Sequence, residues 1–148
     1  MSAVKKVHAK VQKILTQNLG SAEIDETGHF IVRHNSAITF VEVGEGFGDD
    51  GVVIAINCPL LTDVKLTNEL FRHVATEGQQ FKIGGLIVQP DDKGKTGWVL
   101  YCYSIIADDL DESELMQAVL GVSYIGDDLG ADLQKRFGGE LFGDDESE

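Results

Sequence analysis

Two glycine-containing motifs of the chain look like phosphate-binding sequences. Residues 44–51, GEGFGDDG, have closely spaced glycines, but a phosphate loop joins a strand to a helix, and the sequence predicts strands on both sides of this loop. Its acidic side chains would also repel a phosphate group. Residues 94–96, Gly-Lys-Thr, match the end of a Walker A motif, but Gln89 stands at the position of its first glycine. The sequence therefore predicts no nucleotide site.

The other residues that carry chemistry also lack the spacing of a catalytic or metal site. Residues 121–125, GVSYI, begin like a nucleophile elbow, but the closing glycine is missing and the segment lies within a predicted helix. The acidic pairs at 49–50 and 91–92 lack the spacing of a calcium loop. The histidines, which form neither an HxxxH nor an HExxH pattern, are His8, His29, His34 and His73. We therefore predict a non-enzymatic protein that uses no cofactor and no metal.

The composition is that of one cytoplasmic domain. The chain has 148 residues, of which 43% are hydrophobic, and a chain of this length buries about 70% of its unfolded surface in a core. Cys58 and Cys102 lie in apolar runs without a CxxC spacing, and the N-terminus lacks the apolar stretch of a secretory signal, so we expect reduced thiols. No apolar run approaches the roughly 20 residues that a membrane span requires.

The net charge of -13 is unevenly distributed along the chain. Residues 1–20 carry a charge of +4, residues 21–107 carry -6, and residues 108–148 carry -11. Such a field repels nucleic acids and anionic lipids, so we expect neither a nucleic acid nor a membrane as partner. A basic or polypeptide partner fits the charge better, although solubility alone also accounts for an acidic surface.

Apolar periodicity predicts helices packed on an antiparallel sheet. The predicted helices cover residues 3–18 and 67–77, and a long last helix begins near Asp111 and extends through Phe137. The predicted extended segments are residues 22–26, 29–34, 37–43, 51–60, 80–89 and 97–106. This order predicts an α+β fold, with an antiparallel sheet of five to six strands and with N-terminal and long C-terminal helices. Residues 1–143 would form a single domain, and residues 144–148 a disordered acidic tail.

Two features leave details of these elements open. Pro59 is expected to end the pairing of the fourth strand, because proline cannot donate to a ladder. Gly121, Gly126 and Gly130 each cost about 1 kcal/mol relative to alanine in a helix interior. The last helix must therefore be held by tertiary packing, or it must kink.

The apolar surplus of the chain predicts an interface as well as a core. A sheet with two long helices has one covered face, so we expect part of the other face, or the second helix, to contact a partner. The alternative, equally supported by the residues, is that the second helix closes the core of a monomer. Apolar residues on that helix are Leu70, Phe71 and Val74.

The chain resembles the type III secretion chaperone-like fold, and specifically its YbjN type. The resemblance covers roughly residues 4–142. It lies in the Lys/Val-rich first helix, GHFIVRHNSAITFVEV, GWVLYCYSIIADDLDESEL and the closing ADLQKRFGGELF. It implies a small acidic cytoplasmic protein, often a homodimer, that holds an extended segment of a client protein. The implied dimer interface comprises Leu70, Phe71 and Val74. The implied client-binding residues are Val7, Val11, Ile38 and Phe40.

These observations favour a polypeptide-binding, chaperone-like protein. The alternative is a regulatory or scaffold protein that docks one folded partner through its acidic surface, mainly that of the last helix. The two functions differ in their expected salt dependence, because contacts between charged surfaces weaken with ionic strength and apolar contacts do not.

Overall fold

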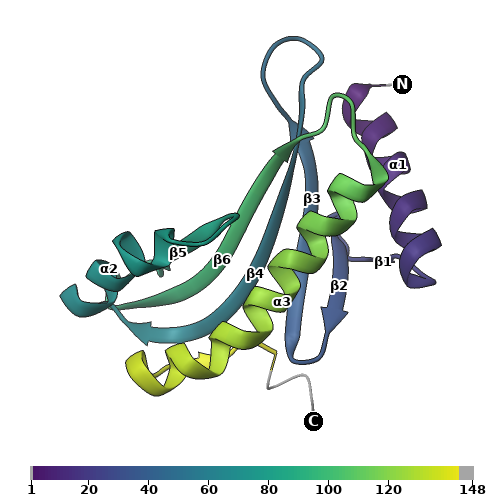
Figure 1. Cartoon of the computed structure of the whole chain (residues 1–148). Helices are drawn as coiled ribbons and strands as arrows, with labels where there is room; N and C mark the ends of the chain where they lie inside the picture. The colour runs from purple at the N-terminus through teal and green to yellow at the C-terminus, as the bar shows by residue number, and fades with distance from the viewer. Residues whose placement is uncertain (1, 144–148) are drawn as a thin grey trace.

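The computed structural model describes residues 2–143, which form a seven-stranded sheet and the helices packed on it (Figure 1). The elements are α1 (Ala3–Leu19), β1 (Glu23–Ile24), β2 (Phe30–His34), β3 (Ala37–Glu45), β4 (Val52–Lys65), α2 (Asn68–Ala75), the 3-10 turn η1 (Glu77–Gln79), β5 (Gly85–Pro90), β6 (Thr96–Ile106), α3 (Glu112–Phe137) and β7 (Glu140–Leu141). The α+β prediction, with an N-terminal helix and a long C-terminal helix, is confirmed. The acidic tail predicted at residues 144–148 lies outside the described residues.

The sheet has the strand order β1-β2-β3-β4-β6-β5, and β7 pairs with β4 beside this path. Every neighbouring pair is antiparallel. Two tight connections explain most of this order, since β2 and β3 form a hairpin at Asn35–Ser36 and β5 and β6 form another over residues 91–95. Asn35 has a φ of 52°, a left-handed conformation that asparagine tolerates better than most residues. The two-residue strand β7 was not predicted from the sequence.

Pro59 does not end β4, contrary to the prediction. The strand continues to Lys65, with a register shift against β6 between Pro59 and Leu61. Pro59 lies between the last pair that β4 makes with β3, Phe40↔Asn57, and its first pair with β7, Leu61↔Leu141. Because the proline falls at this irregular position, where one neighbouring strand is replaced by another, its missing N–H does not interrupt a regular ladder.

The long helix α3 lies across one face of the sheet (Figure 1). Thr39 Oγ1 of β3 and Ser123 Oγ of α3 form a buried hydrogen bond at 2.8 Å. Gly126 of α3 packs directly on Cys58 of β4. Because side chains alternate along a strand, the even-numbered residues 52–60 of β4, and the residues paired with them, point toward α3.

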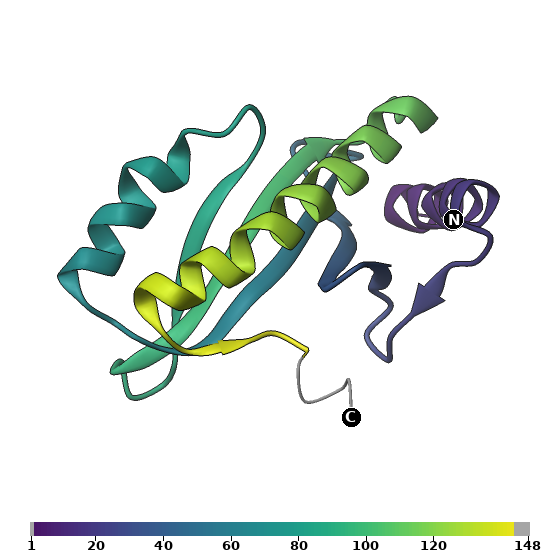
Figure 2. The same ribbon diagram turned by 60° about the horizontal axis from the view of Figure 1, so that its bottom comes forward.

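Helices α1 and α2 pack on the same face as α3. The His8 ring of α1 lies 4.5 Å from that of Phe30, whose partner Val41 points toward α3. Gly78, just after α2, packs against Leu86, which points to this face too. Figure 2 shows α3 between α2 on one side and α1 on the other. The opposite face of the sheet therefore carries no helix within residues 2–143.

Tertiary packing, and not a kink, accommodates the glycines of α3. The helix is continuous from Glu112 to Phe137, and the Asp111 carboxylate caps it by accepting a hydrogen bond from the Ser113 N–H at 2.7 Å. A Cβ atom at Gly126 would collide with the Cys58 sulfur. The absence of a side chain at Gly126 thus lets the helix lie close to β4, and this contact offsets the low helix propensity of glycine.

The second helix is shorter than the predicted residues 67–77. Thr67 is its N-cap, and its side chain accepts a hydrogen bond from the Leu70 N–H at 3.1 Å. The helix ends at Ala75 and is followed by the 3-10 turn η1. Leu70 is buried in the core, so α2 contributes one anchor to the interior and leaves its outer side in solvent.

Candidate functional site

On the helix-free face of the sheet, which we call the open face, the polar Asn57 and Ser104 lie among a larger set of apolar side chains. They come from five neighbouring strands: Ile31 of β2, Phe40 of β3, Val53 and Ala55 of β4, Trp98, Leu100, Cys102 and Ile106 of β6, and Ile87 of β5. Among them Ile106 is 63% exposed, Ile87 48% and Trp98 40%, and the others are half-buried. Monomeric proteins rarely expose an apolar surface that continues across so many strands, and such surfaces usually bind something.

A hollow of about 300 Å³ adjoins the open face at Trp98. Gln89, Pro90 and Asp91 line its other sides. Gln89 and Trp98 are directly paired across β5 and β6, so the hollow lies at the edge of the sheet where these two strands meet their connecting turn. The indole ring of Trp98 thus has free space on one side.

At the opposite border of the open face, polar side chains of β1 to β3 lie beside Ile31 and include a fixed ion pair. The Arg33 guanidinium donates hydrogen bonds to Glu23, at 3.1 Å from Nε and 3.2 Å from Nη2. The hydrogen bond from Arg33 lowers the pKa of the Glu23 carboxyl. His29 lies 3.5 Å from Glu42, which points to the open face beside Ala55. Two carboxylates therefore border the apolar area on this side.

The chain's own last described residues reach the open face. We call residues 139–142 the strap. Gly139 has a φ of 81°, and a Cβ atom there would lie 2.7 Å from the Thr62 carbonyl oxygen, so the turn out of α3 requires glycine. Beyond it, the Phe142 N–H donates a hydrogen bond to the Leu60 carbonyl at 3.0 Å. The Phe142 ring lies 6.0 Å from that of Phe40 and 5.5 Å from that of Trp98.

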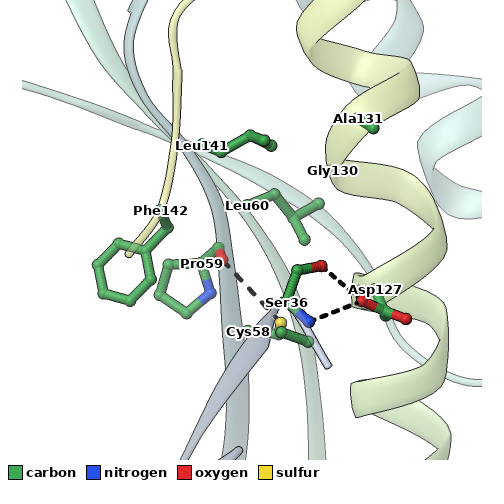
Figure 3. A pocket seen from close by; sticks show the side chains of 11 residues that line it. Ser36, Cys58, Pro59, Leu60, Asp127, Gly130, Ala131, Leu141 and Phe142 are labelled. Carbon is green, nitrogen blue, oxygen red and sulfur yellow. Dashed lines mark hydrogen bonds between the residues drawn. The ribbon is translucent and has the colours of Figure 1, made fainter. Parts of the chain in front are cut away.

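A cavity of about 60 Å³ lies between the strap, β4 and α3 (Figure 3). On its α3 side, the Asp127 carboxylate accepts hydrogen bonds from the Ser36 hydroxyl at 2.5 Å and from Asn35 at 3.0 Å. These bonds, that of Ser36 foremost, lower the pKa of Asp127. Their geometric effect is to fix the β2–β3 turn against α3, so we interpret Asp127 as structural.

Both cysteines are free thiols, as predicted. Burial raises the pKa of Cys58 to about 11 and that of Cys102 to about 11. A thiol with such a pKa is almost fully protonated at neutral pH, and the thiolate is the nucleophilic form. Neither cysteine therefore has the properties of a catalytic nucleophile.

The four histidines lie at separate places in the fold. The His8 ring contacts Phe30, and its Nε2 is 2.9 Å from the Gly28 carbonyl oxygen. His73 packs against Phe137 and pairs with Glu77 at 3.0 Å. The remaining two contact neighbouring side chains, His29 those of Asp25 and Glu42, and His34 that of Tyr124. Within residues 2–143, no group of three or more His, Cys, Asp or Glu residues could hold a metal ion.

The structure does not bring the four predicted client-binding residues together. Val7 lies on the helical side, in an open hollow of about 520 Å³ between α1 and the β3–β4 loop, where Phe47 is 81% exposed. Val11 is buried beneath α1 in the core. Ile38 and Phe40 point to the open face, where Ile38 is buried near Gly143 and Phe40 contacts Phe142. Their role in binding remains a prediction.

The three residues predicted for a dimer interface differ in accessibility. Leu70 is buried in the core, and Val74 is half-buried against it. Phe71 is 44% exposed on the outer side of α2. Of the three, Phe71 is the one that a second copy could contact without a rearrangement of the helix, and the interface itself remains a prediction.

The exposed residues of the open face, none of which the sequence analysis singled out, are Ile87, Trp98 and Ile106. The sequence of β6 does contain a pattern that groups such residues, since Trp98, Leu100 and Cys102 occupy every second position of the strand and so share one face. Alternation divides a strand into two faces but does not say which one the helices cover. That decision depends on how α3 packs, through contacts that join it to β3 and β4, which are far from it in the sequence.

Comparison with protein families shows to which family the chain belongs. Residues 5–145 match the family described as T3SS (YopN, CesT) and YbjN peptide-binding chaperone 1. The chain belongs to this family. The predicted resemblance to YbjN-type and secretion chaperones is therefore confirmed over nearly the whole length. A search of curated proteins gave no match.

Membership in this peptide-binding chaperone family gives the chain a chaperone-like binding role, with a peptide or client protein as partner. The family description names binding and no reaction, in line with the interpretation of the cysteines above. Within the described residues of this family member, no helix is long and apolar enough to cross a membrane.

Proposed function

We propose that the protein holds an extended segment of a client polypeptide on the open face of its sheet. The observation that carries this proposal is the uncovered apolar surface that runs from Ile31 across β3, β4 and β6 to Ile87. The family assignment supports a peptide as the ligand. An extended segment suits this site because its alternate side chains all point to one side and can contact the face together.

The exposed apolar side chains of the open face can contribute enough free energy to bind a client peptide. Complete burial of an isoleucine or a similar side chain contributes about 1.5–3 kcal/mol. Ile87, Trp98 and Ile106 are each only partly buried, so a client that covers them gains a fraction of this value at each position and buries its own apolar side chains as well. Ordering an extended segment costs free energy, and several anchors together offset that cost.

The charge of the protein indicates which client segments it favours. The net charge is -13, and Glu23 and Glu42 lie at one border of the open face. Positively charged residues of the client would be attracted by the net negative charge and by Glu42, whereas both Glu23 oxygens already accept hydrogen bonds from Arg33. This attraction would accelerate association. We therefore infer a client segment in which apolar residues alternate with polar residues that include lysine or arginine.

The proposal can be tested with a short synthetic peptide in which apolar residues alternate with lysine and threonine. Ile87→Asp and Ile106→Asp should each weaken its binding to the protein about tenfold or more, because a carboxylate in an apolar contact must be desolvated. Phe47→Asp is the control, since Phe47 is exposed on the β3–β4 loop. Fluorescence anisotropy of the labelled peptide measures each dissociation constant.

The control also tests the other predicted location. Because Phe47 and Val7 line the same hollow, a client held along α1 would be weakened by Phe47→Asp and not by Ile87→Asp. That result would overturn the placement on the open face. Equal binding by all variants would show that neither location holds the peptide.

The alternative function, docking of a folded partner through the acidic surface, is supported by the exposed acids of α3. Glu114, Asp128 and Asp132 all face solvent on that helix. Binding through these carboxylates should fall steeply as salt increases, whereas binding to the open face should retain most of its affinity. Replacing Asp128 and Asp132 with asparagine should weaken a docked partner and leave peptide binding nearly unchanged.

A further inference from the structure

We propose that the strap occupies the place of a client strand and that the client displaces it. This inference rests on the proposed function. The client segment adds to β4 as an antiparallel strand at the place where β7 now lies. It places an aromatic side chain between Phe40 and Trp98. The client is thereby specified as an extended segment with an aliphatic residue followed directly by an aromatic one.

The first observation is that β4 has an edge that, among residues 2–143, only the strap covers. On one side β4 pairs with β6 along most of its length. On the other side its pairing with β3 reaches Asn57, and the pairs beyond this point are those of Leu61 and Thr62 with β7. With the strap removed, backbone groups of residues 60–62 would be available to another strand, as in other cases of strand addition to a sheet edge.

The second observation is that the strap already makes the contacts expected of a bound strand. Leu141 points toward α3, where a Cβ atom at Gly130 would lie 3.3 Å from its Cδ2. The next residue, Phe142, points away from α3 (Figure 3). On the open face its ring contacts those of Phe40 and Trp98. The adjacent aliphatic and aromatic side chains thus fill one site on each side of the sheet.

The third observation is that the strap is held by few contacts. Strand β7 has two residues, and Phe142 is only half-buried. The burial of Phe142 therefore contributes only part of what a fully buried aromatic side chain would contribute. A client strand that continues along the open face toward Ile87 or Ile106 makes these contacts and additional ones, so it can compete successfully with the strap.

Trp98 provides a direct readout, because it is the one tryptophan of the 148 residues and it contacts Phe142. In Phe142→Ala, the indole should become more accessible, so its emission should shift to longer wavelength. The hexapeptide Gly-Gly-Glu-Leu-Phe-Gly, which copies residues 138–143, should reverse this shift in a saturable manner. The same peptide with alanine in place of phenylalanine should not reverse it.

The alternating peptide described above, extended by adjacent leucine and phenylalanine residues, should bind Phe142→Ala at least about tenfold more tightly than wild type. The reason is that a site occupied by the strap in about nine molecules of ten lowers the apparent affinity by that factor. Phe47→Ala is the matched control, since it removes an exposed phenylalanine from the β3–β4 loop, which lies at the Ile106 end of β6 and not at the Trp98 end. It should change neither emission nor affinity.

A second measurement uses the wild-type protein and does not depend on the stability of a variant. Hydrogen exchange of the Phe142 amide, which donates to the Leu60 carbonyl, should accelerate when the extended peptide, which carries the adjacent leucine and phenylalanine, binds. Unchanged protection of this amide in the saturated complex would overturn displacement of the strap. Equal affinity of folded Phe142→Ala and wild type would overturn it as well.

These outcomes separate this inference from the proposed function. If Ile87→Asp weakens peptide binding but the strap stays in place, the open face binds the client and the strap is a permanent part of the fold. If Ile87→Asp has no effect on peptide binding, the client does not lie on the open face, and the proposed function and this inference both fail.

Discussion

Thr39 Oγ1 and Ser123 Oγ share a hydrogen bond of 2.8 Å in the interior, where β3 meets α3. Both side chains are fully buried, and the Ser123 hydroxyl also lies 2.8 Å from the Val119 carbonyl oxygen. Because a buried hydroxyl must find a partner, this pair fixes the position of α3 along the strand. The helix position in turn decides which face of the sheet stays open.

Removal of either hydroxyl should destabilise the protein, and Ser123→Ala should cost more than Thr39→Val. Ser123→Ala leaves the Thr39 hydroxyl only the Cys58 thiol, a weak hydrogen-bond partner, which costs about 1–3 kcal/mol. Thr39→Val leaves Ser123 its bond to Val119, so a cost of about 1 kcal/mol is expected. Urea denaturation of the two variants and of the double variant measures the difference. The two single variants could lose equal stability, and the double variant could lose the sum of the two losses. That result would contradict a specific role for this pair.

Gly126→Ala should destabilise the protein by about 1–3 kcal/mol, although alanine favours helices, because the new methyl group meets the Cys58 sulfur. Gly121→Ala is the matched control on the same helix, where the nearest atom is the flexible end of Ile83 at 3.1 Å. This control should be close to neutral. The cost of Gly126→Ala should also shrink when Cys58 is replaced with alanine, as thermal unfolding would show.

Asp127 should make stability depend on pH in the acid range. Hydrogen bonds from Ser36 and Asn35 lower the pKa of Asp127 in the folded state below its ordinary value of 3.8. A group with a lowered folded-state pKa contributes stability that is present above the unfolded pKa and is lost as the pH falls through the folded pKa. The stability difference between wild type and Asp127→Ala should therefore be constant near neutral pH and shrink below about pH 4. Asp128→Ala, at an exposed position, is the control and should lose little stability.

If two copies associate through α2, Phe71→Asp should convert a dimer into a monomer, since it places a carboxylate on the exposed apolar side of the helix. Sedimentation equilibrium measures the mass of both proteins. Leu70→Asp is a poor test because Leu70 is buried and its replacement would unfold the chain. A wild-type protein that stays monomeric at high concentration would remove the dimer prediction.

Cys58 and Cys102 should react slowly with a thiol reagent at neutral pH, since burial raises the pKa of each to about 11. Cys58 lies under α3 and should react only when the protein opens. Cys102 points to the open face, so it should react faster than Cys58 and should be protected when the alternating peptide binds. Mass spectrometry of the labelled peptides measures both rates. Equal rates would contradict this placement.

Much of the local structure could be predicted from the sequence, because local signals are strong there. The spacing of Val7, Val11 and Leu15 predicted the first helix to within one residue of its observed end. Asp111 was correctly identified as the start of α3. The continuation of β4 beyond Pro59 was not predictable, because it depends on the neighbouring strand that changes at this point. The two-residue strand β7 is too short to leave a periodic signal.

By itself the sequence determined the α+β class, the order of helices and strands, the family resemblance and the lack of a recognisable catalytic motif. Each of these depends on residue types and on spacing within a segment. The tertiary structure decided which face of the sheet is open, why Val7 and Phe40 lie on opposite sides, and where Phe142 lies. These facts depend on contacts between segments that are distant in sequence, such as Thr39 with Ser123 and Trp98 with Phe142. Local sequence could not replace these contacts, because alternation along a strand is the same whichever face a helix covers.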